Sequence, residues 1–290
     1  MKTFVTVIFN LGPVPWKSLR SVFVRCDLAT DAKKRRDPVG LYILKLEEGS
    51  DQHTCLINSL AELGLAWSTN RESVYSDAQL RGAPLIRLVV ARASRGMGGP
   101  KHGTEYDLSC ACQSCGTGAR QVSPLVLSMS GVSRRAPIFE TPRGEMLVGE
   151  DLKQKIDAIH PRGLELREAI GLGGTGLGFF QLLPEHEMPP MAPSTEGLLR
   201  DEPCAGCSRN GYFGALEHPM RIRYLEEDLD ATDSDAYFTY EWFGYSKLLT
   251  PLAESLLAHP LLLISPRMYE VFADDRLRGL KFEPVEFCSQ

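Results

Sequence analysis

The chain has 290 residues, of which 43% are hydrophobic and 24% are charged, and its formal net charge is −5. These values are ordinary for a globular protein and allow one large domain or two to three small ones. A mildly acidic chain has no general attraction for phosphate backbones, which disfavours bulk nucleic-acid binding. No stretch reaches the roughly 18 apolar residues that a membrane-spanning helix needs. The apolar run after Met1 stops at Asn10 without a cleavage pattern, so we expect a first strand there and a cytoplasmic protein.

The first 95 residues predict an N-terminal α/β module. Apolar runs at 22–24, 41–46 and 85–90 favour strands. The spacing of apolar residues between Thr54 and Leu65 instead favours a helix, with Gly64 near its end. Glycine and proline at 96–103 then interrupt every periodicity, and we expect a linker there.

The region after the linker contains two segments, 146–166 and 262–282, that align without gaps. Each segment consists of an apolar strand, an amphipathic helix and a second strand that begins at an Arg-Gly-Leu sequence. A CxxC pair precedes each of them. We therefore predict two related halves, 104–183 and 184–290, each with a cysteine knuckle and a β-α-β element, in an α+β protein. The alternative is that two β-α-β units resemble one another by chance.

The two CxxC pairs indicate a metal site. They read Cys112-Gln-Ser-Cys115 and Cys204-Ala-Gly-Cys207, and a glycine follows the first pair. Two intervening residues allow a tight turn to direct both thiolates at one ion. Two such pairs complete the closed four-cysteine set that is typical of structural zinc. We predict that Cys112, Cys115, Cys204 and Cys207 bind one Zn²⁺ ion.

Other interpretations of the cysteines remain open. A CxxC pair can exchange thiols and disulfides, so a redox role is one alternative, and isolated buried thiols are another. Cys110 lies two residues before Cys112 and could replace it as a ligand. We expect Cys26, Cys55 and Cys288 to be unpaired structural thiols.

The remaining motifs indicate no catalytic centre. The glycine-rich segment 171–178 lacks the Gly-Lys-Ser/Thr end of a phosphate-binding loop, so we expect a connector. An acidic segment at 226–235 lacks the spacing of a calcium-binding loop. It predicts a solvated face or a surface complementary to a basic partner. The many aromatic residues between 212 and 245 predict core packing or a partner-binding surface.

These residues resemble a known family. The two CxxC pairs are similar to those of the double-CxxCG motif proteins of myxobacteria, and the ending from Leu262 to Val285 resembles the closing β-α-β element of those proteins and of related immunity families. The resemblance covers roughly residues 101–290 and departs at Ser208, where the family pattern has glycine. It implies metal ligation by the four cysteines and no catalytic residue. Some members are immunity proteins that neutralise a polymorphic toxin, which implies a toxin-like protein partner.

Three functional hypotheses follow from the sequence. The first is a non-enzymatic, zinc-stabilised binding protein with a protein partner, in its specific form an immunity protein, without a membrane or nucleic-acid partner. The second is a zinc-knuckle nucleic-acid-binding regulator, although the region lacks interleaved basic and aromatic residues. The third is an enzyme that acts in the N-terminal module, where no acid and base pair is evident.

Overall fold

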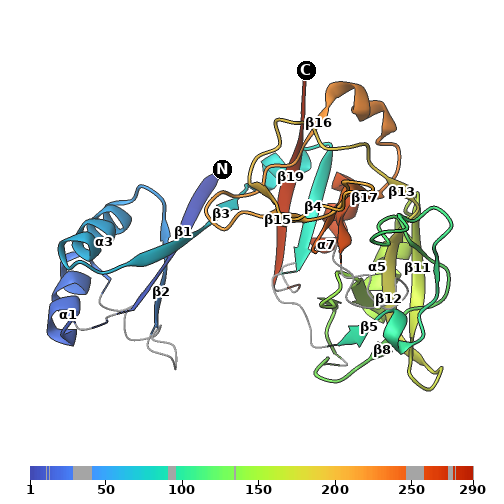
Figure 1. Cartoon of the computed structure of the whole chain (residues 1–290), viewed down its shortest axis with the longest axis horizontal. Helices are drawn as coiled ribbons and strands as arrows, with labels where there is room; N and C mark the ends of the chain where they lie inside the picture. The colour runs from blue at the N-terminus through green and yellow to red at the C-terminus, as the bar shows by residue number, and fades with distance from the viewer. Residues whose placement is uncertain are drawn as a thin grey trace. The chain divides into compact units, whose positions relative to one another are not determined.

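The structure is a computed structural model that describes residues 1–10, 12, 14–28, 41–90, 96–133, 135–245, 258–273, 277 and 279–289 (Figure 1). The chain forms two compact units. The first comprises residues 1–76 and 214–220, and the second comprises 77–213 and 221–290. Helices and mixed sheets are both present, which confirms the predicted α+β class. No helix in the described ranges is long and apolar enough to cross a membrane.

The first unit is a three-stranded antiparallel sheet with two helices. Its elements are β1 (Lys2–Asn10), α1 (Trp16–Arg25), β2 (Leu41–Glu47), α3 (Asp51–Glu62) and β3 (Trp67–Val74). The strand order is β2-β1-β3. Side chains alternate across a strand, so every second residue of β1 enters the core against the helices. The core includes Val5, Val7, Phe9, Leu19, Phe23, Leu56 and Leu60.

Two predictions for this unit are wrong. The apolar run 22–24 lies inside α1, because Leu19, Val22 and Phe23 together form one buried helical face rather than a strand. Cys26 and Cys55 were expected to be unpaired but form a disulfide. Cys26 caps the end of α1, Cys55 lies on α3, and the packed helices bring their Cα atoms to 5.5 Å, within the range that a disulfide requires.

The predicted strand 85–90 exists as β4 (Leu85–Val90), but it belongs to the second unit. It pairs with β18 (His259–Ile264) and β19 (Leu280–Cys288). The N-terminal segment of the first unit therefore ends at Ser76, and α4 (Asp77–Arg81) begins the second unit. The predicted module boundary at residue 95 is therefore wrong. It included β4, whose hydrogen-bonding partner β19 lies nearly 200 residues further along the chain.

The segment 96–103 is not a plain linker. Met97 and Gly98 form β5, which pairs with β8 (Val126–Ser128), and the 3₁₀-helix η1 (Pro100–His102) follows. Gly99 between them has a φ of +91°, and a Cβ atom there would collide with the Arg143 guanidinium. The glycines therefore permit a close approach of the backbone to the sheet rather than a flexible connection.

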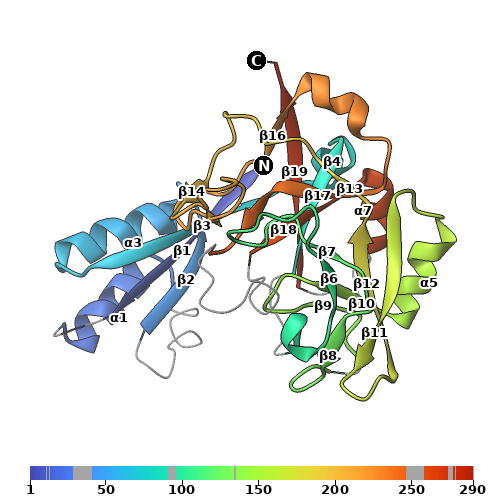
Figure 2. The ribbon, with the colours of Figure 1, turned by 45° about the vertical axis from the view of Figure 1, so that its right-hand side comes forward.

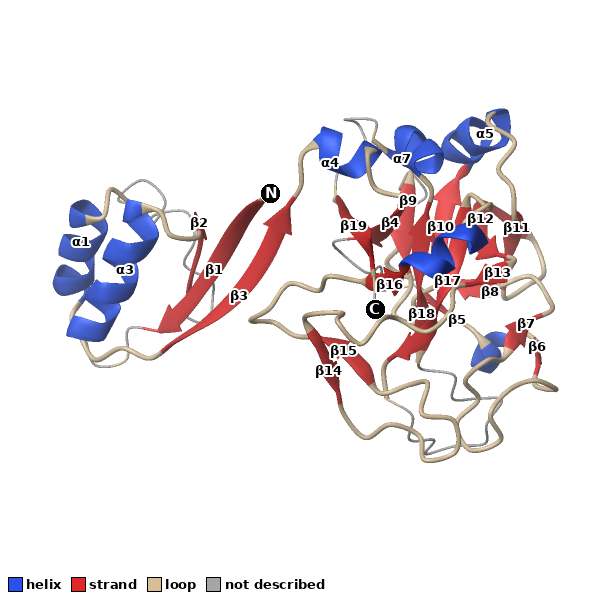
Figure 3. Cartoon of the chain, turned by 90° about the horizontal axis from the view of Figure 1, so that it is seen from above, coloured by secondary structure: helices blue, strands red, loops and turns tan. Residues whose placement is uncertain are grey.

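Two sheets dominate the second unit. The six-stranded sheet has the order β5-β8-β11-β12-β10-β9 and the eight-stranded sheet has the order β14-β15-β17-β18-β4-β19-β16, with β13 beside β17. Figure 3 shows α4, α7 and α5 along one side of the unit. The elements not yet bounded are β6 (Tyr106–Asp107), β7 (Arg120–Gln121), β9 (Ile138–Glu140), β10 (Met146–Gly149), α5 (Glu150–Ala158), β11 (Leu164–Gly171), β12 (Gly176–Pro184), β13 (His186–Glu187), β14 (Leu198–Arg200), β15 (Tyr212–Gly214), β16 (Arg223–Leu225), η2 (Glu226–Ala231), β17 (Ala236–Phe243) and α7 (Pro266–Phe272).

Both predicted strand-helix-strand segments are present, as β10-α5-β11 and β18-α7-β19. In each, a third strand lies between the two parallel strands and runs antiparallel to both. This strand is β12 in the first segment, where Figure 2 shows it beside β11, and β4 in the second. The β12 strand follows directly after β11, whereas β4 precedes both segments in the chain. Arg278, part of the second Arg-Gly-Leu, lies outside the described residues.

The two sheets also agree in the direction of the strands that flank these segments. In the first sheet β9 is antiparallel to β10 and β8 is parallel to β11. In the second sheet β17 is antiparallel to β18 and β16 is parallel to β19. The orders β9-β10-β12-β11-β8 and β17-β18-β4-β19-β16 therefore share every pairing direction.

Candidate metal centre

Each CxxC pair lies at the end of a short pair of strands. The first lies between β6 and β7, and the second between β14 and β15. Within each turn, a backbone amide four residues after the first cysteine donates to that cysteine's carbonyl: Gly116 to Cys112 at 2.7 Å and Ser208 to Cys204 at 2.8 Å. The two knuckles thus have the same local fold.

The four cysteine sulfurs converge on one point, with all of them within 4.8 Å of one another. Cys112 Sγ lies 3.8 Å from Cys204 Sγ, and Cys115 Sγ lies 3.6 Å from Cys207 Sγ. A tetrahedral ion with metal–sulfur bonds of about 2.3 Å places its sulfurs about 3.8 Å apart. Disulfide-bonded sulfurs lie about 2.05 Å apart. The four thiol donors therefore fit a tetrahedral metal ion, and this group could hold one.

The structure places Cys112, and not Cys110, in the four-cysteine group. Cys110 is instead exposed. Cys288 forms no disulfide, as expected, and its Sγ lies 3.3 Å from Ser194 Oγ. Cys115 and Cys204 are almost completely buried, which limits access of solvent to the centre.

A buried asparagine that the sequence did not single out joins the two knuckles. Asn210 has no exposed surface, and its side-chain Nδ2 donates to Thr117 Oγ1 at 3.0 Å. Its Oδ1 accepts the Cys204 backbone N–H at 2.9 Å. Thr117 Oγ1 in turn lies 3.2 Å from Cys115 Sγ. Asn210 precedes a glycine, which is ordinarily a turn signal and gives no hint of a buried amide.

The mutual electrostatics of the four cysteines oppose four simultaneous thiolates. Burial raises the pKa of Cys112, but the backbone N–H of Ser114 and the neighbouring thiols outweigh it and lower that pKa to about 7. Burial raises the pKa of Cys115 to about 12 and also raises that of Cys207. A bound cation would have to stabilise the remaining thiolates, so metal binding here is coupled to proton release.

Arg209, which follows the second CxxC pair, connects the second knuckle to neighbouring strands. Arg209 Nη2 lies 2.5 Å from Glu187 Oε2, and its guanidinium stacks on the Tyr240 ring with its central carbon 3.8 Å from the centroid. Arg209 also donates to the Tyr240 carbonyl. These contacts tie the knuckle to β13 and β17.

Other segments singled out by sequence have structural roles. Within 171–178, residues 172–175 form the turn that connects β11 to β12, and the flanking residues belong to those strands. The acidic segment is exposed at Glu226 and Glu227. Asp235 is instead buried, and its carboxylate accepts hydrogen bonds from Ser265 Oγ at 2.7 Å and Arg267 Nη1 at 3.1 Å. Four of the nine aromatic residues between 212 and 245 are buried in the core, namely Tyr224, Tyr237, Trp242 and Phe243, and the others are half-buried or exposed.

No protein-family model matches the chain, and no curated protein sequence matches it either. The resemblance to the double-CxxCG motif proteins therefore stays a prediction. Fold and site together define an α+β protein with a four-cysteine group that could hold a metal ion.

Proposed function

We propose that this chain is a non-enzymatic binding protein whose second unit is stapled by one structural Zn²⁺ ion at Cys112, Cys115, Cys204 and Cys207. The observation that carries this proposal is the convergence, within 4.8 Å of one another, of four sulfurs contributed equally by two distant segments. Four protein ligands leave no coordination position for a substrate, which suits a structural ion better than a catalytic one.

We propose further that the second unit arose from two copies of one element, each with a knuckle and a split β-α-β. The shared pairing directions in the two sheets support this, as do the matching knuckle turns. In that arrangement the ion joins the copies, because each supplies two ligands. Binding of structural zinc contributes on the order of 10 kcal/mol, comparable to the stability of a whole domain.

For the partner we propose a basic protein, in the specific form a toxin that this chain neutralises. The family resemblance motivates the immunity role. The exposed Glu226, Glu227 and Asp230 on η2 surround the exposed Leu229, and such a surface would attract a basic partner and add an apolar contact.

The predicted cytoplasmic location is a proposal with one feature against it. Disulfides persist mainly in oxidising compartments, so the Cys26–Cys55 bond favours an exported protein. Thiol labelling of Cys26 and Cys55 in intact cells, with and without a reductant, would decide between a cytoplasmic and an exported protein. Labelling only after reduction would favour export.

The first test is the metal content of the purified protein, with thermal unfolding before and after strong chelation. We expect about one zinc per chain and a large loss of stability on removal. Cys204→Ser should lose the metal and unfold the second unit, whereas Cys110→Ser should keep both metal and stability. A metal-free protein with freely alkylated CxxC cysteines would favour thiol redox chemistry instead.

The partner proposal is tested by co-purification with the product of the adjacent gene and by rescue of growth when that product is toxic. The double variant Glu226→Lys/Glu227→Lys should weaken binding and make it slower at low salt. Glu150→Lys/Asp151→Lys, an exposed acidic pair at the start of α5, is the matched control. Salt-sensitive binding of nucleic acid in a gel-shift assay would favour the regulator hypothesis.

A further inference from the structure

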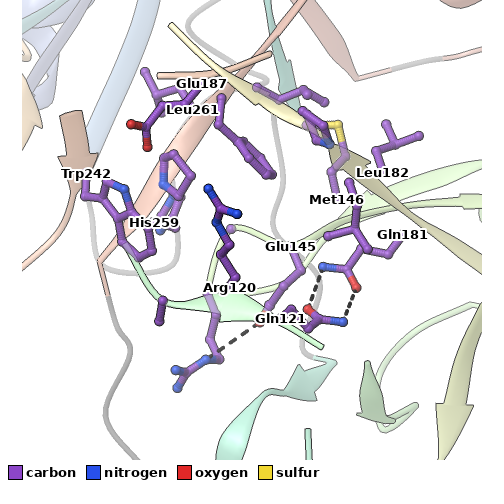
Figure 4. Close-up of a pocket in the computed structure, with 18 of the residues that line it drawn as sticks. Arg120, Gln121, Glu145, Met146, Gln181, Leu182, Glu187, Trp242, His259 and Leu261 are labelled. Atoms are coloured by element: carbon purple, nitrogen blue, oxygen red, sulfur yellow. Dashed lines mark hydrogen bonds and ion pairs between the residues drawn. The ribbon is translucent and has the colours of Figure 1, made fainter. Parts of the chain in front are cut away.

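The second unit contains a cavity of about 570 Å³ that no role proposed above uses. Strands of both sheets line it, as does β7, which follows the first knuckle (Figure 4). Its volume falls within the roughly 300 to 1,000 Å³ typical of sites for small organic molecules. The wall includes the apolar side chains of Met146, Leu182, Phe238, Trp242 and Leu261.

Several polar groups of the wall already have protein partners. The amides of Gln121 and Gln181 hydrogen-bond reciprocally at 2.9 and 3.0 Å, which fixes β7 against β12. Arg167 forms an ion pair with Glu165, and Arg209 forms one with Glu187. These groups shape the cavity, but they have little remaining hydrogen-bonding capacity for a ligand.

Two hydrogen-bond donors of the wall, Trp242 Nε1 and the Arg120 guanidinium, lack such a protein partner among the described residues. The indole Nε1 of Trp242 is buried and has no hydrogen-bond partner in the described part of the chain, and the side chain is only 9% exposed. Arg120 is an exposed residue, and its guanidinium has no hydrogen bond or ion pair to any residue that the structure describes, although its charge acts on Asp107. In Figure 4, Arg120 lies between the Trp242 and His259 side of the cavity and the Met146 and Gln181 side.

Both groups can only donate hydrogen bonds, because neither an indole N–H nor a guanidinium has an acceptor. A buried indole N–H normally has a partner, and leaving it without one costs free energy. A ligand that completes this cavity must therefore bring acceptor oxygens, and a charged acceptor suits Arg120 best.

We propose that this cavity binds a small organic carboxylate with an apolar body, whose oxygens accept hydrogen bonds from Arg120 and from Trp242 Nε1. The apolar body packs on the leucine, methionine and aromatic side chains of the wall. The carboxyl groups of Glu140 and Glu145 also line the cavity, and burial raises the pKa of both. The site is independent of the protein partner proposed above.

The indole N–H signals provide a direct test on the full-length protein. The chain has three tryptophans, and Trp16 and Trp67 are exposed while Trp242 is buried. A ¹H–¹⁵N spectrum should show three indole signals, and the one missing from Trp242→Phe belongs to Trp242. We expect hexanoate to shift that signal saturably. Hexanamide has the same body without the charge, and acetate has the charge without the body, so both should bind much more weakly.

Arg120→Gln should weaken hexanoate binding about tenfold or more, the usual effect of losing one charged hydrogen bond. Arg120→Lys should restore part of it. Arg81→Gln, at an exposed arginine paired with Asp77 and Glu270, is the control and should change nothing. Equal binding of hexanoate and hexanamide, an unchanged affinity in Arg120→Gln, or no saturable shift with any of the three compounds would overturn the proposal.

Discussion

Ser208 adopts in the second knuckle the left-handed backbone conformation that Gly116 adopts in the first, with φ values of +58° and +77°. Both residues directly follow the second cysteine of their pair, and both amides donate to the carbonyl of the first cysteine. The turn therefore requires a positive φ in each knuckle. Serine in place of glycine at position 208 adds conformational strain to the turn without changing its backbone shape.

Ser208→Gly should stabilise the protein, because glycine adopts a positive φ without steric strain. We expect the free energy of unfolding to rise by about 0.5 to 1 kcal/mol, measured by denaturant unfolding of the metal-loaded protein. Ser208 is exposed, so the lost hydroxyl should matter little. The reverse change, Gly116→Ser, should lower stability by at least as much, because Gly116 is buried as well as at a positive φ. A destabilised Ser208→Gly would show that the hydroxyl has a role of its own.

Asn210→Ala should destabilise the second unit and weaken metal binding. The substitution leaves the buried Cys204 N–H without its acceptor and removes one of the two partners of the Thr117 hydroxyl, which costs about 1 to 3 kcal/mol. Hydrogen-bonding partners of metal ligands commonly change metal affinity by about 10- to 100-fold, measurable by competition with a chelator. Gln113→Ala at an exposed position of the first knuckle is the control and should stay within about 0.5 kcal/mol of the parent.

The two glycines of the repeated Arg-Gly-Leu sequence should respond differently to alanine. Gly163 and Gly279 have similar φ values of +64° and +86°, so the backbone strain is comparable. A Cβ atom at Gly163 would collide with Ser234, whereas one at Gly279 would meet nothing within 4 Å. We expect Gly163→Ala to cost about 1 to 3 kcal/mol more than Gly279→Ala in thermal or denaturant unfolding. Equal costs would mean that the loop at Gly163 moves aside freely.

Glu140→Gln should make the protein less sensitive to pH. Burial raises the pKa of Glu140 above its ordinary value of 4.5, although the Arg87 charge opposes the shift. A raised carboxyl pKa contributes stability that is present below pH 4.5 and is lost as pH rises through the folded-state value. The glutamine variant should therefore melt at a higher temperature than the parent at pH 7 and lose this advantage near pH 4. The opposite trend would indicate that the pair with Arg87 dominates.

A fragment that begins at Asp77 should fold, whereas one that begins at Gly96 should not. The shorter fragment lacks β4, so β18 and β19 lose the strand that joins them in the middle of their sheet. We expect cooperative thermal unfolding and bound metal only in the 77–290 fragment. A cooperative 96–290 fragment would show that β18 and β19 can pair directly, which would change the proposed split topology.

Features that depend on short-range spacing could be predicted from the sequence. Two intervening residues place Cys112 and Cys115, and likewise Cys204 and Cys207, in one turn, so each pair was identifiable locally. The helix of α3 was predicted within three residues at each end, from its apolar period and Gly64. Both strand-helix-strand segments were recognisable for the same reason, because the hydrophobic periods of about 3.6 for helices and 2 for strands depend only on neighbouring residues.

Features that depend on distant partners needed the tertiary structure. The run 22–24 is too short to distinguish a strand from the buried face of α1. Nothing near Cys26 indicates that it faces Cys55, because their contact arises only when α1 packs on α3. The strand β4 has an ordinary apolar sequence, and only the fold places it between β18 and β19. The sequence alone indicated the two CxxC pairs as candidate metal ligands and identified α3 and both strand-helix-strand segments, because those properties are local. The tertiary structure decided which strands pair, how Asn210 joins the knuckles and where the cavity lies, because these contacts join residues that no local pattern links.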